Sequence, residues 1–166
     1  MATETASLLS SLNNQRNHVL GILDGLPDDA LRQPVLPTQW TCLGMVRHLI
    51  VSDERFWFRR IVANEPVDLT LTDADYDAAW QVGPETTADS VFDQYRAEIA
   101  HSNEIITATS LDAPPAFWPD YWPNWRLANL REIILHVITE TACHAGHLDA
   151  ARELLDGRTW LAKPRP

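Results

Sequence analysis

Cysteine and long apolar runs are both scarce in this sequence. Cys42 and Cys143 are the two cysteines among 166 residues, too few for the disulfide framework of a secreted domain, so we expect a protein of the reducing cytoplasm. No stretch approaches the roughly eighteen consecutive apolar residues that a membrane-spanning helix needs. Residues 1–16 hold no basic start followed by an apolar core, which argues against a signal peptide.

Positive charge is also in short supply. The sequence has 13 lysines and arginines against 23 aspartates and glutamates, which gives a formal net charge of −10 and a pI near 4.9. A nucleic-acid-binding protein needs a basic surface to replace phosphate counterions, and an anionic membrane would repel a chain of this charge. We therefore expect a soluble protein whose partners are small molecules or other proteins.

Four stretches carry the periodicity of amphipathic helices, and strand signals are almost absent. Three prolines in residues 26–40 break the pattern after the first stretch. Thr41 is the predicted N-cap of the second helix, and Gly157 is the predicted C′ residue of the last. A connection over residues 64–86, with a short helix at about 73–80, links the second helix to the third. The long helices are expected at residues 5–26, 41–63, 87–109 and 127–156, which predicts an all-α four-helix bundle in one domain over residues 1–166.

The last predicted helix places four side chains that can bind metals along one edge of its apolar face. At about 100° per residue, Glu140, His144 and His147 fall within roughly 80° of His136. His144 lies deepest in the apolar arc, with Glu140 one turn before it. Two residues four apart project toward one point, which is the spacing that two ligands of one ion require. A buried glutamate and histidine at one point need either each other or a cation, so both interpretations stay open.

The second predicted helix offers a ligand from the facing side. His48 lies at the edge of its inner face, and a bundle draws metal ligands from facing helices, so His48 is the candidate third ligand. Asp53 falls at about 140° from His48, inside the apolar arc, where an unpaired carboxylate would be costly. An arginine of the same helix, Arg55 or Arg60, is the alternative partner for that carboxylate.

Several other residues with functional chemistry have simpler interpretations. His18 and His101 are expected to be surface histidines or satisfied core histidines. Cys143 is expected to be a small residue that fills space, because a reactive thiolate would need an electropositive environment of its own. The loop from Asp112 to Trp125 is crowded with proline and aromatic residues. It predicts either a packed cover over the core or one wall of a substrate pocket.

The motifs on the second and last helices resemble those of a known family. His48-Leu49 followed by Asp53 gives the pattern HLxxxD, and residues 140–147 give ExxxHxGH. With the run ETACHAGHLDAARELLDG, which ends at Gly157, they resemble the DinB-like superfamily of metal-binding bundles. The resemblance is to an actinobacterial branch that is similar to the mycothiol- and bacillithiol-dependent transferases. It covers nearly the whole chain and implies a four-helix bundle in up-down-down-up order.

The resemblance also implies one divalent metal, usually zinc or nickel. Its ligands carry over onto His48, Glu140 and His144, with Glu140 as the first ligand of the last helix, as in the mycothiol-dependent isomerase branch. His147 stands where many members have glutamine. This departure leaves open whether His147 ligates the metal, orients a ligand or donates to substrate.

Two histidines and one carboxylate leave a coordination position for water or substrate, which is typical of a catalytic metal site. The resemblance implies thiol transfer, in which a low-molecular-weight thiol such as mycothiol binds the metal and attacks a small electrophile. One alternative is a hydrolase with metal-activated water and Asp53 or His147 as general base. Another is a non-enzymatic metal- or ligand-binding module, because a fold does not settle a function. A homodimer is the default expectation for assembly.

Overall fold

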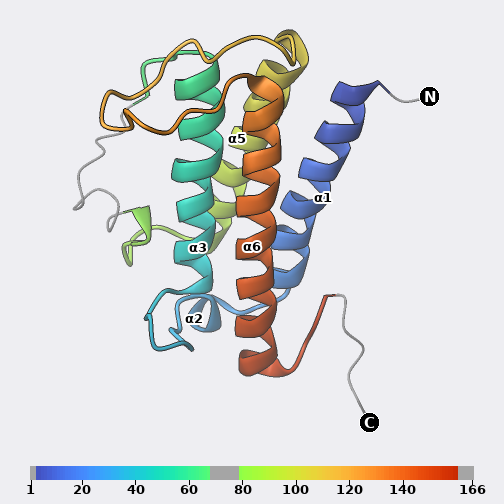
Figure 1. Ribbon diagram of the computed structural model, residues 1–166. Helices are drawn as coiled ribbons and strands as arrows, with labels where there is room; N and C mark the ends of the chain where they lie inside the picture. The colour runs from blue at the N-terminus through green and yellow to red at the C-terminus, as the bar shows by residue number, and fades with distance from the viewer. Residues whose placement is uncertain (1–2, 68–78, 161–166) are drawn as a thin grey trace.

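The computed structural model describes residues 3–67 and 79–160 (Figure 1). Every regular element within these residues is helical and none is a strand, which confirms the all-α prediction. None of the described helices is long and apolar enough to cross a membrane. The elements are α1 (Glu4–Leu23), α2 (Asp28–Leu31), α3 (Cys42–His48), the π-helical segment η1 (Leu49–Val62) that continues α3, α5 (Ala88–Ala108) and α6 (Leu130–Asp156).

The long helices follow the up-down-down-up order that the resemblance implied. In Figure 1, α1 runs downward from the N-terminus, α3 with η1 and α5 both run upward, and α6 returns to the bottom. The parallel pair needs a connection along the length of the bundle, and the chain between Val62 and Ala88 makes it. The short helix predicted at residues 73–80 falls in this connection, mostly outside the described residues. Within the bundle, α1 packs against α6, and η1 packs against α5.

Polar caps and a left-handed glycine set the ends of the helices. Thr41 Oγ1 accepts a hydrogen bond from the amide of Gly44 at 3.0 Å, and Thr87 Oγ1 accepts one from Ser90 at 3.2 Å. These hydroxyls satisfy amides that have no partner within the first helical turn. Gly157 follows α6 with a φ of 79°, a conformation that glycine adopts without steric cost. The predicted caps at Thr41 and Gly157 are therefore confirmed.

Two clusters of buried apolar side chains form the core. One lies among α1, α3, the start of η1, α5 and α6 and includes Leu43 and Leu148. The other lies among α1, the rest of η1, α5, α6 and the loop before α6 and includes Phe58. Trp118 and Trp122 of the aromatic-proline loop pack against the second cluster. The loop is thus a packed cover over the core, which was one of its two predicted roles.

An ion pair between α1 and η1 is buried in the interior. The Arg16 guanidinium donates from Nε to Glu54 Oε1 at 2.7 Å and from Nη2 to Glu54 Oε2 at 2.6 Å, and both side chains are almost fully buried. Arg16 Nη1 also donates to the side-chain oxygens of Asn13 and Asn103. The guanidinium therefore has partners on α1, η1 and α5, which compensate for the loss of water around its charge.

Candidate metal site

His48 is the last residue of α3, and its ring is held between α3 and the segment before α5. The residue is 5% exposed, and the Trp80 indole stacks on its ring with centroids 3.8 Å apart and an interplanar angle of 13°. Ser52, four residues later, places its hydroxyl 3.2 Å from His48 Nδ1. Burial, and to a smaller degree the charge of His144, lowers the pKa of His48 to about 3. His48 is therefore a neutral imidazole at neutral pH.

His144 reaches the same place from α6. Its ring centroid lies 5.0 Å from that of His48, with the two rings at 75°, and Trp80 lies 5.9 Å away. Its Nδ1 atom is buried and has no hydrogen-bond partner in the described part of the chain. Burial, then the charge of His147, lowers the pKa of His144. The structure thus brings two of the three predicted ligands together, both in the neutral form.

Glu140 precedes His144 by one helical turn and is half-buried. Burial lowers the pKa of His136 and of His144, and the Glu140 carboxylate opposes this shift in both rings. Burial raises the pKa of Asp53, and the same carboxylate adds to that shift. Glu140 is therefore within electrostatic reach of all three side chains.

Asp53 faces α6 from within the π-helical segment. Hydrogen bonds in a π-helix span five residues, so residues five apart, such as His48 and Asp53, lie closer to one face than in an α-helix. Asp53 Oδ2 accepts a hydrogen bond from Thr141 Oγ1 at 2.9 Å. Burial, then the neighbouring charge of Glu54, raises the pKa of Asp53 well above its usual value. Asp53 therefore joins η1 to α6 as a buried carboxyl group in a setting that favours its neutral form.

The alternative pairing of Asp53 with an arginine of its own helix is wrong. Arg55 donates from Nε to Glu98 Oε1 at 2.7 Å, across to α5. Arg60 donates to Asn64 and places its guanidinium 3.7 Å from the centroid of the Phe117 ring. Both arginines point away from the interior, because the winding of η1 puts Asp53 on the inner face and the arginines on the flanks.

The remaining polar residues of α6 differ in their burial. His147 is exposed, with its ring centroid 5.7 Å from that of His144 and 6.2 Å from that of Trp40. His136 is half-buried and packs edge-on against Trp57, with centroids 4.7 Å apart. Cys143 is an exposed free thiol on the outer face of α6, so its predicted role as a space-filling residue is wrong.

The two histidines that were expected to be structural are satisfied by carboxylates. His18 Nε2 lies 2.8 Å from Asp149 Oδ1, and its ring stacks on Trp160. His101 Nε2 lies 2.7 Å from Glu65 Oε1. Both histidines therefore have partners that account for their positions, which confirms the structural interpretation.

The chemistry of the His48–His144 pair fits a divalent transition metal. Zinc and nickel bind neutral imidazole nitrogens and carboxylate oxygens, and both imidazoles are neutral at physiological pH. A buried ring nitrogen without a partner, as at His144, needs a hydrogen bond or a metal. Within residues 3–67 and 79–160, no three His, Cys, Asp or Glu side chains are already grouped so that they could hold an ion. Glu140 therefore stays a predicted third ligand.

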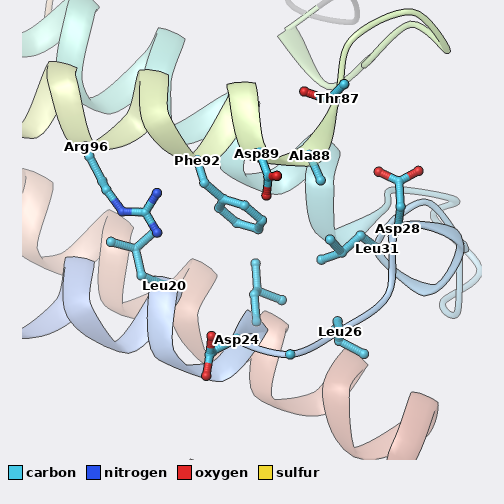
Figure 2. Close-up of a pocket in the computed structure, with 12 residues that line it drawn as sticks. Leu20, Asp24, Leu26, Asp28, Leu31, Thr87, Ala88, Asp89, Phe92 and Arg96 are labelled. Atoms are coloured by element: carbon cyan, nitrogen blue, oxygen red, sulfur yellow. The ribbon is translucent and has the colours of Figure 1, made fainter.

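A cavity elsewhere in the bundle is separate from this pair. It has a volume of about 350 Å³ and lies between the end of α1, α2 and the start of α5. Figure 2 shows Leu20 and Arg96 at one end of it and Asp28 and Thr87 at the other. None of its lining residues is a predicted ligand, so we do not place the metal site there.

The fold and the histidine pair together define the class of the protein. A bundle in up-down-down-up order, with facing histidines on its second and last long helices, is a DinB-like helical bundle. The family model of the mycothiol S-transferases matches residues 7–157, and the chain belongs to that family. No curated protein sequence matches the chain.

Proposed function

We propose that this protein is a metal-dependent thiol S-transferase that joins a low-molecular-weight thiol of the mycothiol type to small electrophiles. The observation that supports this most directly is the pair of neutral imidazoles, His48 and His144, in a chain of the mycothiol S-transferase family. His48, His144 and Glu140 would hold one divalent ion, zinc or nickel. The chemistry that such an ion supplies is stabilisation of the thiolate form of a thiol at neutral pH.

The protein's own side chains would prepare the site in three ways. Stacking against Trp80 and the hydroxyl of Ser52 fix the plane of the His48 ring, and burial keeps it unprotonated. The Trp80 indole also keeps water from one face of that ring. His147, exposed beside His144, is placed to contact the incoming thiol or substrate from the solvent side. In the transfer itself, the thiol loses its proton, its sulfur bonds to the electrophilic atom, and the displaced group leaves with the electron pair.

Cys143 is the competing nucleophile within the chain. It is exposed on the same helix as His144, whereas burial raises the pKa of Cys42 to about 11 and keeps that residue a thiol. The proposal assigns the nucleophile to the external thiol, because Cys143 lies on the outer face of α6 and His144 on the inner side. Free thiols at both positions fit the proposed cytoplasmic setting.

The hydrolytic alternative is less well supported. A general base has to be unprotonated at working pH and within reach of water. Asp53 is only 3% exposed, its carboxylate already accepts a hydrogen bond from Thr141, and burial raises its pKa, so it is poorly suited to activate water. Of the two bases considered for hydrolysis, His147 alone is accessible.

Metal content tests the site directly. Protein purified without added metal should contain about one zinc or nickel ion per chain by elemental analysis. His144→Ala should lose most of that metal because it removes a ligand, and Glu140→Ala should lose it for the same reason. The matched control is His101→Ala, whose ring pairs with Glu65 at the surface. Equal metal content in the His144→Ala and His101→Ala proteins would rule out the site.

Turnover tests the reaction class. The protein is incubated with a panel of small electrophiles, with and without mycothiol or a related thiol, and loss of free thiol is measured. We expect turnover that requires the added thiol, is abolished by His48→Ala and survives Cys143→Ser. Substrate conversion without any thiol would identify a hydrolase. Metal binding without conversion of any electrophile would identify a binding module.

A further inference from the structure

The cavity between the end of α1, α2 and the start of α5 has an apolar floor. Its volume of about 350 Å³ is within the range of pockets that hold small molecules. The hollow forms because α1 ends at Leu23, and Gly25, with a φ of 74°, turns the backbone away toward α2. Large apolar side chains that belong to the core or pack against it line the cavity: Leu20, Leu23, Leu26, Leu31 and Phe92.

The rim of the cavity is charged, and two of its charged side chains have partners within the protein. Asp28 Oδ2 accepts a hydrogen bond from Arg32 Nε at 2.7 Å. Hydrogen bonding to Arg32 lowers the pKa of Asp28, and the backbone amide of Ala88 adds to this shift. At the other end of the cavity, Arg96 Nη1 donates to Asp93 Oδ1 at 3.0 Å. The charges of Asp28 and Arg96 are therefore compensated without a ligand.

Asp24 and Asp89 are the two other carboxylates of the rim. Both residues are exposed, and neither carboxylate forms an ion pair or hydrogen bond with any residue in the ranges 3–67 and 79–160. Figure 2 shows Asp24 on the α1 side of the cavity and Asp89 on the α5 side, with Phe92 extending from α5 toward α1. Arg152 and Arg158 lie close to Asp24, but their guanidinium groups donate to its backbone oxygen and not to its carboxylate. The rim therefore presents two uncompensated negative charges above an apolar floor.

We propose that this cavity binds a small organic cation, a primary amine with an apolar body. The apolar body contacts the leucines of the floor, and the ammonium group lies between Asp24 and Asp89. The face of the Phe92 ring also attracts a cation. Charge complementarity selects this occupant over a neutral or an anionic molecule, and the net charge of −10 on the chain raises the local concentration of cations.

This site is separate from the proposed metal site. His48, Glu140 and His144 are absent from the lining of the cavity. The amine is therefore not assigned as the electrophile or the thiol of the transfer reaction, and its binding does not depend on a metal ion. A failure of one proposal leaves the other unaffected.

Isothermal titration calorimetry of the full chain with 2-phenylethylammonium tests the proposal. Two probes of similar shape, uncharged 2-phenylethanol and anionic phenylacetate, isolate the contribution of the positive charge. We expect saturable binding of the ammonium probe, about fivefold weaker binding of the alcohol and no measurable binding of the anion. Higher ionic strength should weaken binding of the cation, because the carboxylates are exposed to solvent.

Substitutions in the lining locate the bound probe. Asp24→Asn and Asp89→Asn each remove one uncompensated charge and should weaken binding of the ammonium probe about fivefold. The matched control, Asp120→Asn, removes the charge of an exposed aspartate outside the cavity and should leave the affinity unchanged. Ala88→Leu adds apolar volume inside the cavity and should abolish binding, with a cooperative melting transition to show that the variant folds.

Binding in the His144→Ala protein distinguishes the cavity from the metal site, because an amine can also ligate a metal ion. We expect the affinity of this variant for the ammonium probe to equal that of the wild type. The proposal is overturned if the wild type shows no saturable binding, or if it binds the alcohol as tightly as the amine. It is also overturned if binding is unchanged in Asp24→Asn and Asp89→Asn, persists in folded Ala88→Leu, or is lost in His144→Ala.

Discussion

The burial of a neutral His48 predicts how the stability of the bundle depends on pH. A histidine in an unfolded chain has a pKa near 6.5, whereas burial lowers the pKa of His48 in the folded protein to about 3. Between these values the unfolded state binds a proton that the folded state does not. The free energy of unfolding therefore falls as the pH drops from about 6.5 toward 3. At pH 4.5 the loss from this residue amounts to about 3 kcal/mol relative to pH 8, at 1.36 kcal/mol per pH unit.

Urea unfolding of the metal-free protein measures this effect. Wild type and His48→Gln are compared at pH 8 and pH 4.5 in the presence of chelator, so that loss of metal does not contribute. Glutamine is polar and does not titrate, and all other titratable groups are shared by the two proteins. We expect the drop in unfolding free energy between the two pH values to be about 3 kcal/mol smaller in the variant. The same drop in both proteins would show that the His48 ring is not held neutral under Trp80.

Two further predictions concern stability. Glu54→Ala leaves the buried Arg16 without its partner and should cost about 3–5 kcal/mol, a fall in melting temperature of roughly 6–20 °C for a chain of this size. The control, Asp93→Ala, removes the exposed pair with Arg96 and should cost less than about 1 kcal/mol. Equal losses in the two variants would show that the buried ion pair stabilises the bundle no more than the exposed one. Chelation should lower the melting temperature by roughly 5–10 °C if the free metal concentration was 100-fold above its dissociation constant. An unchanged melting curve after verified metal loss would show that the stability of the bundle does not depend on the ion.

The sequence predicted the helices well because apolar periodicity and capping residues act locally. The predicted N-cap at Thr41 and the C′ glycine at Gly157 are both where the structure has them. The first helix ends earlier than predicted, at Leu23 rather than at residue 26. Gly25 has a φ of 74°, which the helix cannot continue through, and Pro27 follows it. The meeting of His48 and His144 was also predictable, because each lies on the inner edge of its own helix.

Contacts between distant segments could not be predicted in the same way. The stacking of Trp80 on His48 brings a residue of the long connection against the end of α3, and no local pattern in the sequence marks this contact. The Arg16–Glu54 pair joins α1 to η1. The periodicity of a single helix does not predict which residue of another helix it will contact. Ser52 is the exception, because a hydroxyl four residues after a histidine on a helix is a recognisable signal for a ring contact.

The π-helical winding of η1 explains which predictions for the second long helix were correct and which were wrong. A regular α-helix over residues 41–63 would turn by about 100° per residue. His48 precedes η1, so this angle applied to it and its inward position came out correctly. Asp53 lies inside η1, and its predicted position within the apolar arc is nevertheless correct. The alternative in which its carboxylate pairs with Arg55 or Arg60 failed, because Thr141 is its partner. A metal site built from His48, Glu140 and His144 therefore depends on residues outside the irregular segment. Asp53 instead holds the start of that segment against α6 through Thr141.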